Sequence, residues 1–447
     1  MGVAVVDCSS MADLLARIDA ADIVLAHTWN TPELFSLLIG QLPPMRLLIW
    51  VHIAGRAVPQ VVPGVIIRRA DAVVATSERS LAHIRDAAIG RPIEPRLIQP
   101  FRGLDAFFSV ARSRSDRYRV ACVGALDGHK LHVDVITQIA RIDASGLRFT
   151  FIGDGPWRAA LARQAVESCA VGAIAFCGWA ADMPTALADV DVLAVPMPPT
   201  SWASADLAIM EAMAAGIPPV MLCPEGKSDL VTDGVDGIVT EKEDQFIGAL
   251  SVLGRDVSRR EALGAAARAT AMTRFDPRHT ARAFHALWDA MLDMPKRGHA
   301  EVELSADSDR WRHGRGARLA CLAYADHWST LAGSLSRDSK VASAADAAIA
   351  SASELVLAPV AGGLMHYLSA HPDDPWLAFW CGLVFSGMRL PLRAAAMFER
   401  ARLNGFPDTY RLDAHASATA AQVVAVAPVK RVGGAGDARA SGALSGP

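Results

Sequence analysis

A single carboxylate in an otherwise small and apolar segment is the first residue that could do chemistry. In "SADLAIMEAMAAGIPPV", residues 204–220, strong helix formers surround Glu211, and Gly216 fits a left-handed cap after the last turn. A charged group is seldom buried without a partner. The helix therefore either exposes Glu211 to water or directs it at something polar.

Three glycine-containing loops follow predicted strands, and they are "VGALDGHK" at 123–130, "FIGDGPW" at 151–157 and "FCGWAADM" at 176–183. Glycine at positions 124, 153 and 178 lets backbone amides approach a ligand closely, and a helix amino terminus favours phosphate oxygens through its unpaired N–H groups. Asp154, directly after Gly153, is typical of a turn. One such loop would be weak evidence, but three in one domain indicate a ligand site.

The elements that must position these residues alternate between short apolar runs and helical patterns, which is typical of parallel βαβ units. The first third predicts strands at 3–6, 22–27, 46–52, 72–76 and 95–100, with helices at 11–20, 31–40 and 77–88. After a polar stretch at 112–117, a second series predicts strands at 118–126, 148–155, 173–179, 190–196 and 218–223, with helices near 133–143, 157–170, 183–189 and 207–215. Two parallel-sheet domains imply a cleft between them, with ligands at the carboxyl ends of the strands.

The remaining chain changes character. The segment after Pro277 has the apolar spacing of a helix with one packed face, 296–315 is charged and predicts a linker, and 316–412 is Ala-rich and helical in pattern. Small and aromatic residues in 378–407 have the spacing of a tetratricopeptide-type hairpin, although any antiparallel helical hairpin would look similar; they are Gly382, Phe385, Ala394, Phe398 and Ala401. The aperiodic tail at 413–447 predicts disorder.

Composition excludes several classes of protein. The 447 residues carry a formal net charge of -3, which gives no pull toward nucleic acid or anionic lipid. Seven cysteines without a CxxC pair indicate reduced thiols and show no metal site. No apolar run reaches the ~20 residues that a membrane-spanning helix needs. We therefore expect a soluble, cytoplasmic protein, with peripheral membrane contact left open.

Together these segments resemble the retaining glycosyltransferases of glycosyltransferase family 4. The resemblance covers roughly residues 20–295, and "EAMAAGIPPV" is its most specific part. Further matching segments, in family order, are "VGALDGHK", "FIGDGPW", "ADVDVLAVP", "EGKSDLVTDGVDGIV" and "FDPRHTARAFHALWDAML". The resemblance implies an α/β GT-B fold, in which two Rossmann-like domains, 1–112 and 113–295, face each other across a cleft, here with a helical C-terminal appendage.

The resemblance also implies roles for individual residues. Glu211 would accept hydrogen bonds from the ribose hydroxyls of a nucleotide sugar, and a carboxylate suits two adjacent donors. Lys130 would neutralise charge on the departing diphosphate without a metal, and His52, at the end of a first-domain strand, would face the donor sugar. Backbone and loop positions complete the predicted donor site, namely Asp206, Leu207 and Ala208 at the helix start, Gly124 and Gly153 in the loops, and Gly178 and Trp179 beside the base.

Each of these residues also has an ordinary structural explanation, and the sequence departs from the family pattern. Ala203 stands where an acidic residue usually contacts the donor sugar, Ala125 where an arginine is usual, and Asp206 where a glycine is usual. A carboxylate at position 206 would repel a phosphate unless it is turned away. The first domain also begins about two βα units late, which indicates either a start upstream of Met1 or a reduced acceptor domain.

Two functions are compatible with these features of the sequence. The first is a cofactor-free, metal-independent transfer of a hexose from a nucleotide diphosphate sugar to a glycan or lipid-linked acceptor, as in polysaccharide biosynthesis. The second is a catalytically impaired binding or scaffold protein, favoured by Ala125 and Ala203. In both, the helical C-terminal region is a candidate surface for a protein partner, and no nucleic acid is expected.

Overall fold

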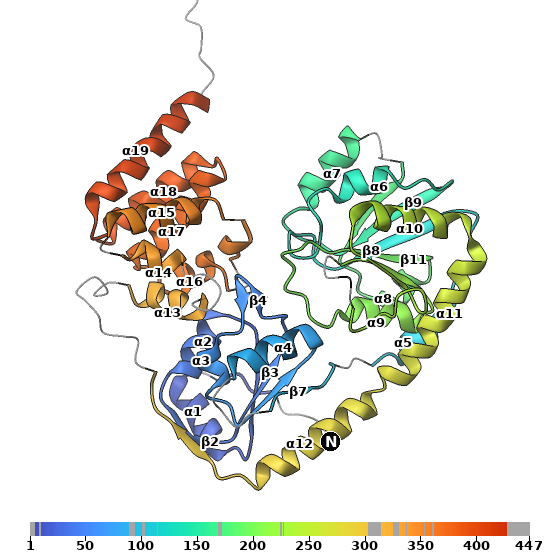
Figure 1. The fold of residues 1–447 in the computed structure, drawn as a ribbon, viewed down its shortest axis with the longest axis horizontal. Helices are drawn as coiled ribbons and strands as arrows, with labels where there is room; N and C mark the ends of the chain where they lie inside the picture. Colours follow the sequence, from blue (N-terminus) through green and yellow to red (C-terminus); the bar gives the residue numbers. More distant parts are fainter. Residues whose placement is uncertain are drawn as a thin grey trace, which may run out of the picture.

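The chain forms two parallel sheets and a C-terminal group of helices (Figure 1). The computed structural model describes residues 5–8, 10–88, 94–100, 103–113, 115–168, 172–223, 226, 228–302, 314–324, 330–336, 338–352, 354–359 and 362–426. No helix in these ranges is both long enough and apolar enough to cross a bilayer.

The first sheet has four parallel strands in the order β1 (Val24–Thr28), β3 (Leu47–Val51), β6 (Ala72–Ala75) and β7 (Arg96–Leu97). All residues of β3 and β6 are buried, as expected for parallel strands covered on both faces. The connecting helices are α1 (Met11–Ala20), α2 (Pro32–Ile39), α3 (Gly64–Ile67) and α4 (Glu78–Ala87). Ser10, Thr31 and Ser77 cap α1, α2 and α4 through their hydroxyl oxygens.

The predicted strand at 3–6 is wrong where it can be assessed. Val5 and Val6 lie outside any strand and are exposed, while residues 3 and 4 lie outside the described ranges. A short apolar run predicts a buried strand only if a neighbouring strand pairs with it. Here β1 has β3 as its partner, and no other described strand pairs with β1.

The second sheet has six parallel strands, ordered β10-β9-β8-β11-β12-β13. Their bounds are β8 (Tyr118–Val123), β9 (Leu147–Ile152), β10 (Ile174–Gly178), β11 (Val192–Pro196), β12 (Pro219–Leu222) and β13 (Ile238–Thr240). The helices are α6 (Val135–Ala140), α7 (Arg158–Glu167), α8 (Met183–Leu187), α9 (Leu207–Ala214) and α10 (Glu243–Arg255). Apart from β13 and α10, these elements lie where the sequence pattern predicts them.

Two segments belong to a different domain from the one that their sequence position suggests. The short helix α5 (Asp105–Phe108) packs on α9, with Leu104 and Phe107 in the core of the second domain. The second domain therefore begins before residue 113. Conversely, α11 (Val257–Arg274) leads to α12 (Pro277–Leu292), which returns to the first sheet, where Phe284 and Trp50 meet edge to face.

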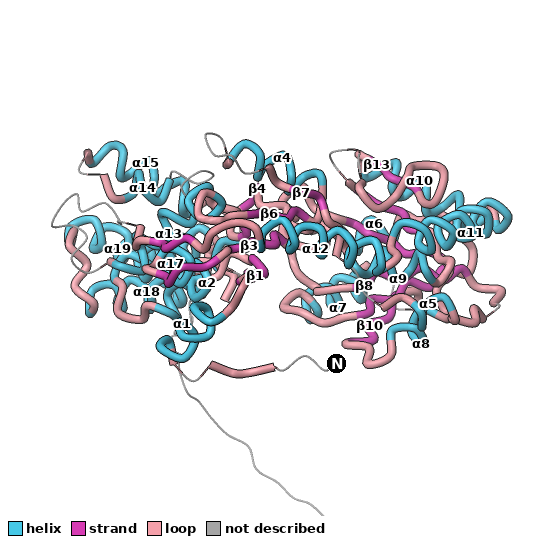
Figure 2. The backbone as a smooth tube through the Cα atoms, turned by 90° about the horizontal axis from the view of Figure 1, so that it is seen from below, coloured by secondary structure: helices cyan, strands magenta, loops and turns pink. Residues whose placement is uncertain are grey.

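The C-terminal helices continue the first domain. They are α13 (Arg315–Tyr324), α14 (Thr330–Ser334), α15 (Ser339–Ala350), a 3-10 turn at Glu354–Leu357, α16 (Leu364–Ala370), α17 (Pro375–Gly387), α18 (Pro391–Leu403) and α19 (Thr409–Val426). They share one hydrophobic core with α2 and β3, and Figure 2 shows the first sheet between these helices and the second domain.

The structure changes three expectations for this region. Residues 413–426, predicted to be disordered, are helical in α19, while 427–447 lie outside the described ranges. In the predicted linker, β14 (Arg297–His299) pairs antiparallel with β2 (Leu42–Met45), and 303–313 are not described. The hairpin α17–α18 forms, with Gly382 against the ring of Phe398, but a tetratricopeptide relationship stays a prediction.

The two sheet domains touch through the loop before α9. Ile53 forms an antiparallel bridge with Ala203, and the Ala54 N–H donates to the Trp202 carbonyl at 2.9 Å. Ser204 Oγ forms hydrogen bonds with the hydroxyl groups of Thr76, Ser77 and Ser80. A second contact links the helical region to the second domain, because the Trp157 indole N–H donates to Glu354 Oε1 at 2.5 Å.

Candidate functional site

Helix α9 carries Glu211 in the interior of the second domain. Asp206 caps its start, Gly216 follows its end with φ of 72°, and its small side chains allow close packing against α11 and α5. The Glu211 side chain is only 3% exposed, yet it lines a cavity at the carboxyl ends of the strands. Of the two arrangements that the sequence leaves open, the structure has the one in which Glu211 faces a site.

The three glycine loops meet beside this helix. The Gly124 N–H donates to the Ile152 carbonyl at 3.0 Å, and the Gly153 N–H donates to the Gly178 carbonyl at 2.8 Å. All three glycines have positive φ, at 137°, 141° and 72° for Gly124, Gly153 and Gly178. The predicted convergence of these loops is therefore present in the structure.

A cavity of about 560 Å³ lies between the loops and α9. This volume falls within the roughly 300–1,000 Å³ of small-molecule sites. Its lining includes the predicted residues Gly124, Gly153, Trp179, Leu207, Ala208 and Glu211. Larger hollows beside Arg315 (about 680 Å³) and beside Leu15 (about 930 Å³) are lined by none of these residues.

The cavity lining also includes residues that the sequence analysis did not name as site residues. Phe107 and Ala106 of α5 line the cavity, as do Asp182 and Pro184 around the start of α8. A four-residue helix such as α5 gives too short an apolar pattern to be detected. The Trp179 side chain is 85% exposed, so it stands at the rim rather than in the core.

Lys130 and Asp206 lie beside the cavity as an ion pair. Lys130 Nζ is 2.5 Å from Asp206 Oδ2, and the Lys130 stem passes next to Gly124. Asp206 Oδ1 also accepts the backbone N–H of Ala208 at 3.1 Å. The carboxylate is thus turned toward a lysine, which neutralises the charge that would repel an anion.

His129 next to Lys130 is held by the interdomain loop. Its ring stacks on Trp202, with centroids 3.9 Å apart, and its Nδ1 accepts the backbone N–H of Trp202 at 3.3 Å. Burial and the neighbouring Lys130 charge lower the pKa of His129 to about 3, against an opposing effect of Asp206. His129 is therefore neutral at physiological pH.

His52 does not line the cavity of Glu211. It lies after β3 in an aromatic group, stacked on Trp29 at 4.6 Å and on His27 at 5.0 Å, and its Nε2 is 2.8 Å from His27 Nδ1. Burial and the nearby His27 lower the pKa of His52 to about 4. A neutral imidazole can exchange hydrogen bonds with a sugar hydroxyl but does not stabilise an anion by charge.

The alanines that depart from the pattern of the resemblance lie in two different places. Ala125 lines the cavity, and Ala203 takes part in the bridge to Ile53. The Asp154 side chain makes local contacts, because its Oδ1 accepts the Gly155 N–H at 2.8 Å and its Oδ2 accepts from Arg158 at 3.1 Å, while its role as a turn former stays a prediction. Asp154 also lines the cavity.

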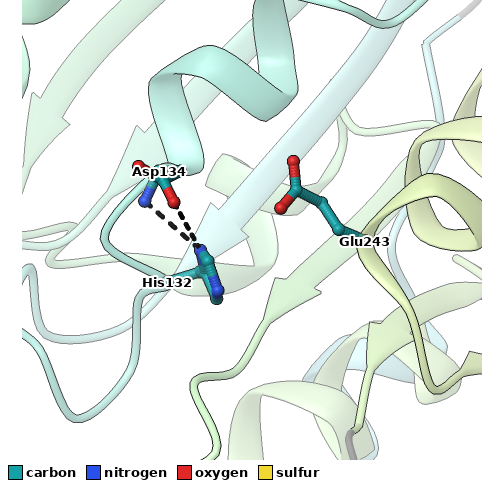
Figure 3. Close-up of side chains that lie close together, drawn as sticks. All are labelled: His132, Asp134 and Glu243. Atoms are coloured by element: carbon teal, nitrogen blue, oxygen red, sulfur yellow. Dashed lines mark hydrogen bonds and ion pairs between the residues drawn. The ribbon is translucent and has the colours of Figure 1, made fainter.

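One group of side chains in the described ranges has the composition of a metal site. His132, Asp134 and Glu243 bring ligand atoms within 4.8 Å of one another (Figure 3). Glu243 already accepts from Arg141 at 2.9 Å, and the Asp134 N–H donates to His132 Nδ1 at 3.3 Å. None of the three lines the cavity, so they take no part in the candidate site.

Comparison with family models gives a match in the second domain. Residues 117–256 match the family model described as "Glycosyl transferases group 1", a segment that contains α9 and the three glycine loops. No curated protein matches the chain.

Among solved structures, Anabaena HepE in complex with UDP is similar, at 18% identity over 62% of this chain and 81% of that chain, with a TM-score of 0.52. HepE in complex with UDP-glucose has the same identity and coverage and a TM-score of 0.50. Sucrose-phosphate synthase from Thermosynechococcus elongatus is 21% identical over 55% of this chain and 68% of that chain, with a TM-score of 0.48. The expected α/β GT-B fold with a helical C-terminal region is confirmed.

Proposed function

We propose that this protein is a retaining glycosyltransferase that transfers a hexose from a nucleotide diphosphate sugar to a glycan or lipid-linked acceptor. One observation carries the proposal: Glu211 is buried, yet lines a cavity together with the start of its own helix and the glycine loops. A carboxylate is an acceptor for two neighbouring hydroxyls, and a helix amino terminus offers N–H groups to phosphate oxygens. Ribose and diphosphate of one ligand would use both.

The donor is proposed to lie along this cavity. Glu211 accepts from the ribose hydroxyls, while the backbone amides of Leu207 and Ala208 hold the diphosphate. The base lies near Gly178 and Trp179, whose exposed indole offers a surface for it. The family match over 117–256 and the bound UDP and UDP-glucose of the similar HepE structures support this arrangement.

The chemistry needs few protein groups. As the bond from the sugar to the diphosphate breaks, negative charge grows on the leaving oxygen, and Lys130 is the cation next to the helix start that could stabilise it. In a front-face route the departing diphosphate takes the acceptor proton, so no protein nucleophile is required. The proposed reaction is therefore independent of a metal or other cofactor.

The acceptor is proposed to bind the first domain. His52 and Trp29 directly follow β3 and β1, and the carboxyl ends of parallel strands are the usual ligand edge of such sheets. Trp29 is 46% exposed, so its ring is accessible to a sugar. Peripheral membrane contact would bring a lipid-linked acceptor to this edge, and the helical region would serve a protein partner.

A second candidate is a nucleotide-sugar-binding protein without transfer activity. Ala125 and Ala203 favour it, and so does the pairing of Lys130 with Asp206, which occupies the cation proposed for the leaving group. A screen of uridine, guanosine and adenosine diphosphate sugars by ligand-detected NMR, followed by turnover assays with the donor that binds, separates the candidates. Release of free nucleoside diphosphate supports the enzyme; binding without release under saturating donor supports the second candidate.

A further inference from the structure

Asp206 makes two contacts that define its role. It stands immediately before α9, its Oδ1 accepts the Ala208 N–H at 3.1 Å, and its Oδ2 lies 2.5 Å from Lys130 Nζ. The Asp206 side chain is 9% exposed and that of Lys130 is 21% exposed, so water screens the pair only in part. One carboxylate therefore engages one helix amide and one ammonium group.

These two donors are the same groups that the proposed function assigns to the diphosphate. Phosphate and carboxylate oxygens bind amide and ammonium groups with similar geometry, because both are anionic acceptors. Two anions cannot share these donors without mutual repulsion. The unliganded site therefore already contains an anion where the diphosphate is expected.

The charges around the cavity determine how strongly this competition affects an anionic ligand. Among the described residues, the lining contains three carboxylates, Asp154, Asp182 and Glu211, and neither lysine nor arginine. Lys130 lies beside the cavity, and Asp206 cancels its charge. Without a change at this pair, a diphosphate would enter a site that has no net positive charge from these side chains.

We propose that Asp206 acts as an internal substitute for the donor diphosphate, and that the donor binds only by displacing this carboxylate from Lys130 and from the start of α9. This inference rests on the proposed function of the cavity and adds a residue that sets donor affinity. Ligands that contact both the base and ribose positions overcome the competition, whereas a bare diphosphate gains less. Asp206 thereby raises the binding free energy that a diphosphate-containing ligand must gain from its base and ribose contacts.

The test is calorimetric titration of the full chain with UDP, inorganic pyrophosphate and uridine. Asp206→Asn keeps the helix cap, because asparagine caps as well as aspartate, but removes the charge. The matched control is Asp256→Asn, since Asp256 likewise caps α11, by accepting the Arg259 N–H at 2.9 Å, and does not line the cavity. Melting temperatures of both variants report whether they fold.

We expect Asp206→Asn to bind UDP and pyrophosphate about tenfold more tightly than the unaltered protein, with uridine affinity unchanged. Asp206→Gly should shift both anions in the same direction, while Asp256→Asn should shift nothing. The inference is overturned if Asp206→Asn binds neither UDP nor pyrophosphate more tightly than the unaltered protein does. It is also overturned if pyrophosphate binds to neither the variant nor the unaltered protein. A loss of affinity would equally overturn it, because Asp206 would then be holding Lys130 in place for the ligand.

The outcome is separable from that of the proposed function. A gain with pyrophosphate, together with no preference for UDP over pyrophosphate and no effect of Glu211→Ala, would support the competition by Asp206 and contradict the nucleotide-sugar site. UDP binding that depends on Glu211 but not on Asp206 would support the nucleotide-sugar site and contradict the competition by Asp206.

Discussion

The backbone at Gly153 runs so close to Gly124 that a β-carbon on Gly153 would lie 1.9 Å from the Gly124 carbonyl oxygen. Gly153 also has φ of 141°, a conformation that residues with a side chain rarely adopt. Two of the loops that form the cavity are therefore in contact through bare backbone. Neither loop can move away without disturbing the ends of β8 and β9.

Replacing Gly153 by alanine should destabilise the second domain and disrupt the cavity. We expect a loss of at least about 2 kcal/mol in the free energy of unfolding, because steric overlap adds to backbone strain. Urea unfolding measures the loss. Gly172→Ala is the matched control, since no atom lies within 4 Å of its added β-carbon. Equal stability of the two variants would contradict the close contact.

Two of the histidines with lowered pKa values, His52 and His129, predict how stability changes with pH. An unfolded histidine titrates near pH 6.5, whereas the pKa is about 4 for His52 and about 3 for His129. Between these values the unfolded chain binds protons that the folded chain does not, so the free energy of unfolding falls as pH decreases from about 6.5 toward 4 and then 3. Each histidine contributes a slope of at most about 1.4 kcal/mol per pH unit.

Urea unfolding at pH 7.5, 6 and 5 measures this slope. His129→Gln keeps a hydrogen-bond acceptor for the Trp202 N–H but does not titrate, so its stability should depend less on pH than that of the unaltered protein. Parallel curves for the two proteins would show that His129 is not buried as a neutral ring.

The Trp29 ring offers a test of the proposed acceptor edge. Trp29→Ala removes an exposed ring that stacks on His52. Trp29 is far in sequence from the residues of the donor cavity. Loss of the aromatic surface should lower kcat/KM for the acceptor by about five- to tenfold, with donor affinity unchanged. Steady-state transfer assays and donor titrations measure the two effects. Weaker donor binding with normal acceptor kinetics would place Trp29 at a different site.

The shared core predicts that the C-terminal helices unfold with the first domain. Gly362 has φ of 72°, and a β-carbon there would lie 1.6 Å from the carbonyl oxygen of Asn30, which belongs to the first domain. Gly362→Ala should therefore lower the melting temperature of the first domain and the helices together, by several degrees for about 2 kcal/mol. Donor binding to the second domain should persist below that transition.

Scanning calorimetry with bound UDP follows both units, and Gly298→Ala serves as control because its added β-carbon contacts nothing within 4 Å. Separate transitions for the first domain and the helices would contradict a common core.

Local patterns in the sequence were enough to predict the glycine loops of the second domain and all of its strands except β13. Three of its strands, β8, β9 and β10, are short apolar runs that end in glycine or directly before it, and such runs depend little on distant residues. The position of Glu211 followed from its helix and the resemblance together. Helix α19 was missed because residues 413–426 show no apolar period, although alanine favours helix in any context.

Other features depend on contacts between residues far apart in the chain. The pairing of β14 with β2 joins segments separated by about 250 residues, and no local pattern specifies it. The packing of α13 and α16 on α2 likewise depends on which apolar faces meet. The contact of Asp206 with Lys130 could not be predicted either, since the sequence shows a carboxylate at position 206 but not its partner.

The most direct measurement of the central claim is the affinity of Glu211→Ala for the donor identified by the screen, compared with that of Glu261→Ala. Glu261 is an exposed glutamate on α11 that does not line the cavity, so it controls for the loss of one carboxylate. If Glu211 holds the ribose, Glu211→Ala should bind the donor roughly 10- to 100-fold more weakly, while Glu261→Ala binds normally. Unchanged donor affinity in a folded Glu211→Ala protein would contradict the account.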